Sequence, residues 1–133
     1  RDIKIISKNL NLKEIKDLYS ITDCYVSPYR AEGFNLTPLE AAACGSQIVI
    51  TKGGCTDDYY NPCLGFQIES NEKKVDDRYF LMPNIDSLVN ILEEKVINKP
   101  DNSKMERSNY VVKNFSWDKV ASKLKEEFRN KLK

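Results

Sequence analysis

The sequence predicts an α/β fold, in which helices cover both faces of a parallel, Rossmann-like sheet. Three short apolar runs of strand type, at 3–6, 24–26 and 47–50, alternate with two segments that carry helix start signals. Strands and helices that alternate at this spacing are typical of βαβ units, whose parallel strands are buried on both faces. A chain of 133 residues corresponds to one domain with a single hydrophobic core.

The first predicted helix begins after Asn11, which forms a capping box with Glu14. Helical spacing predicts that its inward face consists of Leu12, Ile15, Leu18 and Tyr19. A second helix follows the strand at 24–26 and stops at Gly45, since glycine readily adopts the left-handed conformation that ends helices.

The second half gives weaker signals. Asp57 and Asp58 are expected to begin a short helix, and the runs 64–68 and 79–82 predict short strands. The charged stretch 69–78 between them is interpreted as a solvated surface loop.

Three helices are predicted in the C-terminal third. The first is capped by Asn84, ends at Lys99-Pro100, and is expected to turn inward Ile85, Leu88, Ile91, Leu92 and Val96. The second covers 103–113. The third is capped by Ser116 and carries apolar side chains at helical spacing, with Trp117 expected in the core: Trp117, Val120, Ala121, Leu124 and Phe128.

Composition excludes several classes of function. The net charge is +1 with acids and bases mixed, which does not indicate nucleic-acid or anionic-membrane binding. No apolar run has the length of a membrane span and no signal peptide is recognisable, so a cytoplasmic location is expected. The four cysteines form no CxxC pair and histidine is absent, which predicts reduced thiols and no metal site.

The stretch 32–45, E-G-F-N-L-T-P-L-E-A-A-A-C-G, carries the strongest functional signal. Glu32 and Glu40 are separated by seven residues that include a turn and a predicted helix start. Thr37 is predicted as the N-cap, Pro38 as the first helical residue and Glu40 as the N3 partner of a capping box. A strand, a glycine-containing loop and a helix N-terminus together direct backbone N–H groups at an anion, typically a phosphate.

This stretch resembles the signature E-G-F-G-L-x-x-L-E-A-x-A-x-G of nucleotide-sugar-dependent, retaining glycosyltransferases of the GT-B fold, of the group 1 or family 4 type. The resemblance implies that Glu40 binds the ribose hydroxyls of the donor nucleotide and that the catalytic Glu32 lies near the transferred sugar. It also implies that the backbone amides of the turn hold the sugar and diphosphate, which assigns donor binding to Gly33, Phe34, Asn35 and Leu36.

Two positions depart from the family pattern, with Asn35 in place of glycine and Gln47 in place of proline. Asparagine tolerates the left-handed conformation, so the turn is expected to survive, with added bulk next to the donor. The resemblance is strong over 18–54, loose in the middle and moderate from 105, where Phe115-Ser116-Trp117 precedes an amphipathic helix as at the end of that family.

The resemblance implies that 1–133 is a truncated C-terminal domain, the donor-binding half of a GT-B enzyme. A start at Arg1 without methionine agrees with a piece of a longer protein, and the family's diphosphate-binding arginine and lysine precede the first predicted strand. Arg30 lies in the loop where it could contact a phosphate, although solvent exposure is the expectation for it. The acceptor would bind to an N-terminal domain of the same enzyme.

The function expected from this resemblance is hexosyl transfer with retention, without a metal or cofactor, from a UDP- or GDP-linked sugar. The isolated chain is expected to be inactive. The alternative is a non-catalytic Rossmann-like module that binds a nucleotide or a partner protein, because a fold by itself does not dictate a function.

Overall fold

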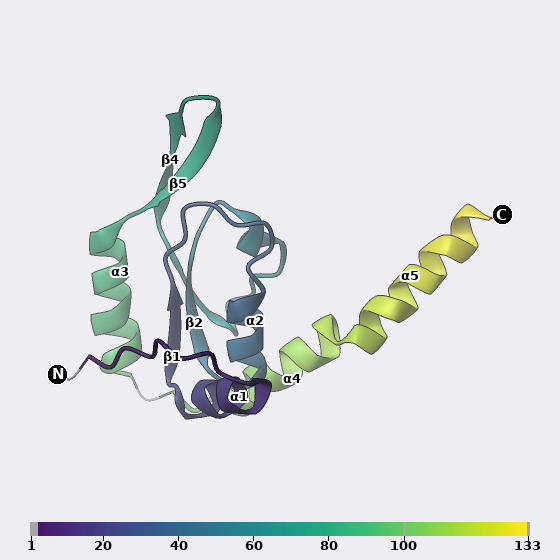
Figure 1. The fold of residues 1–133 in the computed structure, drawn as a ribbon, viewed down its shortest axis with the longest axis horizontal. Coiled ribbons are helices and arrows are strands. Elements are labelled where there is room, and N and C mark those ends of the chain that lie inside the picture. The colour runs from purple at the N-terminus through teal and green to yellow at the C-terminus, as the bar shows by residue number, and fades with distance from the viewer. Residues whose placement is uncertain (1–2, 100, 133) are drawn as a thin grey trace.

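The computed structural model describes residues 3–99 and 101–132 and confirms the predicted α/β class (Figure 1). The elements are, in order, α1 Leu12–Ile21, β1 Cys24–Ser27, α2 Leu36–Ala43, β2 Gln47–Thr51, the 3₁₀ helix η1 Cys55–Asp58, β3 Gly65–Ile68, β4 Ser70–Val75, β5 Arg78–Pro83, α3 Ile85–Ile91, the π-helix η2 Leu92–Ile97, α4 Lys104–Phe115 and α5 Trp117–Lys131.

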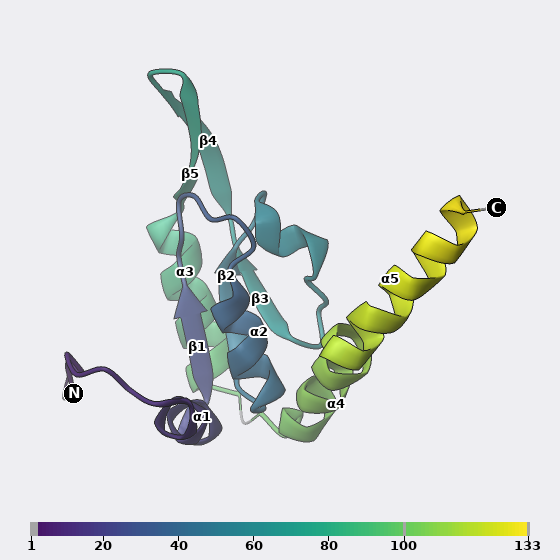
Figure 2. The ribbon, with the colours of Figure 1, turned by 45° about the vertical axis from the view of Figure 1, so that its right-hand side comes forward.

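Strands β1, β2 and β3 form a parallel sheet in that order, with β2 in the centre. Ile48 and Ile50 of β2 pack in a core cluster with Leu39 and Ala42 of α2. Val49 points to the opposite face of the pleated strand and is also fully buried. Helices α2 and α3 lie on opposite sides of the sheet (Figures 1 and 2), so both of its faces are covered as predicted.

A close approach between two backbones fixes the start of β3. Gly65 has φ +150°, and a Cβ added there would lie 1.9 Å from the carbonyl oxygen of Ile48. Strand β3 therefore pairs with β2 in this register only with glycine at position 65.

A buried arginine ties α4 to the end of α2. The Arg107 side chain donates to the carbonyl of Gly45 from Nε at 3.0 Å and from Nη2 at 2.8 Å. It also forms a bidentate pair with Asp101, in which Nη1 lies 3.0 Å from Oδ1 and Nη2 contacts Oδ2. This residue satisfies an orphan carbonyl at the helix end and holds α4 against α2.

The strand predicted at 3–6 is wrong. Ile3 and Ile5 are 90% and 88% exposed, and Figure 2 shows this segment running away from the sheet. A strand is stable only when its N–H and C=O groups pair with a neighbour, and within the described part of the chain the segment has none. By contrast, α1 begins as predicted, with both hydrogen bonds of the Asn11 and Glu14 capping box formed. The predicted inward face is only partly right, because Leu12 is exposed.

The surface loop predicted at 69–78 is also wrong, because this segment forms most of the antiparallel hairpin β4–β5. Asp76, at φ +53°, makes the two-residue turn between Val75 and Arg78 possible. The charges are solvated, as expected, since the hairpin projects beyond the sheet (Figure 1). The backbone N–H of Leu81 donates to the carbonyl of Arg30 at 2.8 Å and joins the hairpin to the loop after β1.

The predicted caps of the C-terminal helices are confirmed. Asn84 accepts from the N–H of Ser87 at 2.8 Å, and Ser116 accepts from that of Lys119 at 3.4 Å. Ile85 is exposed rather than turned inward, whereas the other four residues predicted to face inward are half-buried. Of the predicted stop at Lys99-Pro100, Pro100 lies outside the described residues.

The apolar stripe of α5 is not part of the core. Trp117 is 85% exposed, and Leu124 and Phe128 are exposed as well. Helix α5 extends away from the sheet in both views (Figures 1 and 2), so the core position expected for Trp117 is wrong. Among the described residues, no helix combines the length and apolar character needed to cross a membrane.

Candidate functional site

The candidate site is the loop that joins the carboxyl end of β1 to the start of α2. In open parallel sheets, ligands bind outside the carboxyl ends of the strands, next to helix N-termini. Glu32 lies in this loop and Glu40 lies on α2, and both side chains are exposed. Exposure leaves both carboxylates available to a ligand.

The start of α2 differs from the prediction. The N-cap is Asn35, in the left-handed conformation with φ 57° and ψ 70°, and its side chain forms no cap hydrogen bond. Thr37 therefore lies inside the first turn, Pro38 is the third helical residue, and Glu40 is beyond N3, so the predicted capping box is absent. Proline is tolerated there because a first-turn residue needs no intrahelical N–H partner.

Asn35 is held in place by three hydrogen bonds. Its Nδ2 donates to the Ser27 hydroxyl at 3.1 Å, and its Oδ1 accepts from the Thr37 hydroxyl at 3.1 Å. Its backbone carbonyl accepts from the Tyr59 hydroxyl at 2.9 Å. The residue is only 9% exposed and its side chain bonds to Ser27 and Thr37, so it adds little bulk to the exposed side of the turn.

Tyr59 is the residue of this site that the sequence did not reveal. Burial raises the pKa of Tyr59, so its phenol stays protonated and continues to donate to Asn35. Its ring also packs against Phe34, with centroids 5.3 Å apart. Tyr59 directly follows η1, a segment that the sequence predicted only weakly, and no sequence pattern there indicated a role for this tyrosine.

The N-terminus of α2 is open to solvent. Its N-cap residue, Asn35, does not bond to the first-turn N–H groups with its side chain. A Cβ added at Gly33 would meet nothing within 4 Å, which shows free space directly beside the turn. Free amides and the positive end of the helix dipole together favour an anion at this place.

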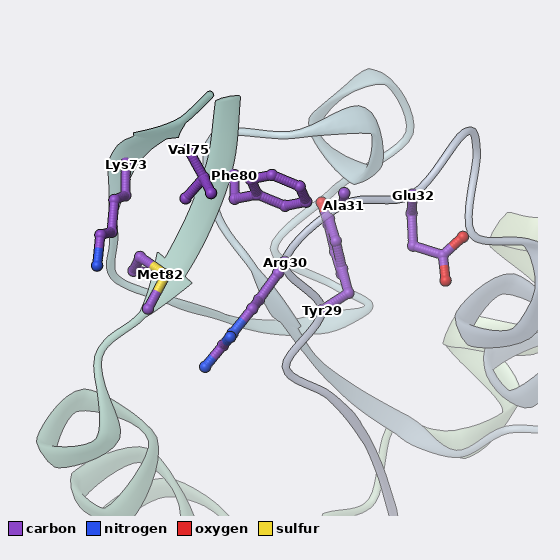
Figure 3. Close-up of a pocket in the computed structure, with 8 residues that line it drawn as sticks. All are labelled: Tyr29, Arg30, Ala31, Glu32, Lys73, Val75, Phe80 and Met82. Atoms are coloured by element: carbon purple, nitrogen blue, oxygen red, sulfur yellow. The ribbon is translucent and has the colours of Figure 1, made fainter. Parts of the chain in front are cut away.

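The two glutamates line different hollows beside the loop. Glu40 lines a hollow of ≈ 380 Å³ together with Phe34 and Leu36. Glu32 lines a hollow of ≈ 610 Å³ on the side of the hairpin (Figure 3). The structure therefore brings Phe34, Leu36 and Glu40 together in one hollow, and Glu32 does not line it.

Other reactive side chains do not add to this site. Within residues 3–99 and 101–132, no three His, Cys, Asp or Glu side chains gather closely enough to hold a metal ion. The four cysteines are free thiols. Burial raises the pKa of Cys24 to about 11, and it also raises the pKa of Cys55 and Cys63, so these thiols are protonated at neutral pH and weakly nucleophilic.

Residues 4–107 match the family described as glycosyl transferases group 1. The chain belongs to this family. Over 138 aligned residues it is 29% identical to "Uncharacterized protein 356" of Sulfolobus islandicus rod-shaped virus 1, a match that covers 95% of the chain and 39% of the viral protein. Over 40 residues it is 52% identical to the lipopolysaccharide core biosynthesis mannosyltransferase LpsB of Rhizobium meliloti (strain 1021), covering 30% of the chain and 11% of that protein.

The membership accounts for the fold, since a Rossmann-like sheet flanked by helices is the architecture that the family resemblance implied. The chain is thus a glycosyltransferase-family domain. It spans well under half the length of these two relatives.

Substitutions of Asn35 test whether the turn depends on its conformation or on its side chain. Asn35→Gly keeps the left-handed conformation but loses the bonds to Ser27 and Thr37, which should lower the free energy of unfolding by about 1 kcal/mol. Asn35→Ala loses the same bonds and adds left-handed strain of about 1 kcal/mol more. Urea denaturation followed by circular dichroism should rank the wild type above glycine and glycine above alanine. An alanine variant at least as stable as the glycine variant would show that the backbone conformation is not what matters.

Proposed function

We propose that this chain binds the nucleotide-sugar donor of a retaining glycosyltransferase that needs no metal ion. The observation that carries the proposal is the uncapped N-terminus of α2, beside a turn that Asn35 and Tyr59 hold in a fixed shape. Such a terminus offers fixed backbone donors to the diphosphate of the donor.

In this proposal, Glu40 accepts hydrogen bonds from the ribose hydroxyls, and Glu32 orients the transferred sugar and stabilises an oxocarbenium-like transition state. The amides of Gly33, Phe34, Asn35 and Leu36 stabilise the negative charge that develops on the leaving diphosphate. Preorganised N–H donors lower the barrier when they point at the position where charge develops, and they supply here what a metal ion supplies elsewhere.

The separation of Glu32 from Glu40 supports these two roles. The two residues line different hollows beside the turn. A donor whose diphosphate lies on the turn amides would extend its nucleoside toward Glu40 and its sugar toward Glu32. The acceptor would be bound mainly by another domain, since the chain covers 39% of its viral relative, and we expect no transfer by the isolated chain.

Titration of the ¹⁵N-labelled chain with UDP and with GDP tests the proposal. We expect a dissociation constant on the order of 1 mM, because one helix terminus and a few charge-assisted bonds yield about 4 kcal/mol after association costs. Amide shifts should appear first at 33–40. Submicromolar binding, or shifts confined to another region, would contradict the assignment.

Glu40→Gln isolates the ribose contact. A neutral amide replaces the charged acceptor, so the dissociation constant of the nucleoside diphosphate should rise by about tenfold. Stability should not change, because Glu40 is exposed and caps no helix. Glu126→Gln, an equal charge change on exposed α5, is the matched control and should bind like the wild type. If both variants bind equally, Glu40 does not hold the ribose and the alternative of a non-catalytic binding module gains support.

A further inference from the structure

One face of the β4–β5 hairpin stands across a hollow from the loop that carries Glu32 (Figure 3). The hollow measures ≈ 610 Å³, and its lining residues come from these two segments alone: Tyr29, Arg30, Ala31, Glu32, Lys73, Val75, Phe80 and Met82. The loop and the hairpin are joined by the backbone bond from Leu81 to Arg30, so the two walls are held together.

The strand register makes this hairpin face basic. Lys73 lies opposite Phe80, and Val75 lies opposite Arg78, so these four side chains share one face. Glu72 and Lys74 alternate to the other face, where Lys74 lies 5.8 Å from the ring centroid of Tyr79. The face toward the hollow therefore contains cations and apolar groups and no carboxylate of strands β4 and β5.

The two cations of the hollow are not neutralised within the protein. None of the salt bridges formed in residues 3–99 and 101–132 involves Arg30 or Lys73. In Figure 3 the Arg30 guanidinium and the Lys73 ammonium extend to the same side, whereas the Glu32 carboxylate points away from both. A planar guanidinium and an ammonium on facing walls suit a phosphate group.

The remaining wall of the hollow is apolar. Val75, Phe80 and Met82 line it beside the two cations. An anion that binds here is therefore best accommodated when it is attached to a ring or another apolar body, because burial of that body adds to the charge attraction.

We propose that Arg30 and Lys73 form a subsite for a phosphate-bearing acceptor, whose apolar part packs on Val75, Phe80 and Met82. The assignment to the acceptor rests on the proposed function, because Glu32, on the side of the transferred sugar, lines this hollow and Glu40 does not. Binding of a phosphate attached to an apolar body does not depend on that assignment. The hairpin thus gives the donor-binding domain a direct part in acceptor choice.

Phenyl phosphate is the probe, since it joins a phosphate to a ring. Titrated into the ¹⁵N-labelled chain, it should shift the amides of 30–32 and 73–82, and it should bind more tightly than either inorganic phosphate or benzyl alcohol. Arg30→Met and Lys73→Met should each weaken it by about tenfold. Lys74→Met, the same charge change on the opposite face, should leave its affinity within about twofold of the wild type.

UDP binding, measured in the same variants, distinguishes an acceptor subsite from a contribution of the two cations to donor binding. Its affinity should be unchanged in Arg30→Met and Lys73→Met, with shifts that remain at 33–40. Equal effects of Lys73→Met and Lys74→Met on phenyl phosphate would overturn the subsite. Parallel weakening of UDP would instead assign the cations to the donor diphosphate and overturn the acceptor role. A failure of UDP to shift 33–40 would count against the proposed function and would leave the phenyl phosphate result standing.

Discussion

Gly65→Ala is expected to prevent the chain from folding, the largest effect of a methyl group added at any of its five glycines. The new Cβ would lie 1.9 Å from the Ile48 carbonyl oxygen, and the obstacle is the backbone of the central strand rather than a movable side chain. Relief would require separating β3 from β2, at a cost above about 4 kcal/mol. Circular dichroism and proton NMR of the purified variant should show loss of cooperative structure.

Gly33→Ala is the matched control for this experiment, because the same methyl group there meets nothing within 4 Å. It should fold with nearly the stability of the wild type. A well-folded Gly65→Ala variant with native thermal stability would mean that β2 and β3 do not pair in the register described.

Arg107→Met is expected to lower the free energy of unfolding by about 3 kcal/mol, since it removes the arginine's hydrogen bonds to Asp101 and to the Gly45 carbonyl. Arg107 is 1% exposed, so water does not readily replace the lost bonds. Methionine fills a similar volume, which limits the cavity contribution. Arg107→Lys keeps the charge without the planar fork and should fall between methionine and the wild type in urea denaturation.

The effect of Arg107 depends on pH in a defined direction. Burial alone raises the pKa of Asp101, but the hydrogen bond from Arg107, the N–H of Ser103 and the charge of Arg107 together outweigh it and hold the pKa below its usual 3.8. A carboxylate with a depressed folded-state pKa stabilises the fold above its unfolded pKa and loses this contribution as pH falls through the folded value. The difference in stability between the wild type and Arg107→Met should therefore be largest near neutral pH and shrink below about pH 4. A constant difference down to pH 2 would show that packing, and not the ion pair, carries the effect.

Local signals in the sequence predicted much of this fold because their physical causes are local. Asn11, Asn84 and Ser116 each cap the helix that they were predicted to cap. The side chain of each reaches an N–H group three residues away, and no distant part of the chain is needed for that bond. The β2 strand was equally clear, since its apolar side chains are buried on both faces of the sheet.

The wrong predictions concern segments whose structure depends on contacts with residues far away in the sequence. The run 3–6 has the composition of a strand, but no composition can supply a neighbour to pair with it. The hairpin β4–β5 is solvated on both faces of β4, so its charges follow no pattern that distinguishes a strand from a loop. The helical stripe on α5 was recognised correctly, yet a stripe does not specify the surface that covers it.

The loop and helix of the candidate site were predicted from the sequence, but the residue at which the helix begins was not. The loop and the following helix lie where the Glu32 to Glu40 pattern indicated, whereas the helix start depends on a choice between Thr37 and Asn35. Tyr59, 24 residues along the chain from Asn35, donates to the Asn35 carbonyl at the observed helix start. A bond of this kind between remote segments is visible only in the folded structure.

The position of Trp117 has a consequence for fluorescence spectroscopy. It is the single tryptophan of the sequence, and it is 85% exposed at the first turn of α5, where it lines the same hollow as Glu40. Its indole is therefore already hydrated in the native state, and unfolding of the core should hardly change its emission. Any surface that docks on the apolar stripe of α5 would remove water from the same indole and shift the emission to shorter wavelength. Tryptophan emission in this chain thus reports on what α5 contacts, and the unfolding of the core is better followed by the tyrosines and the peptide bonds.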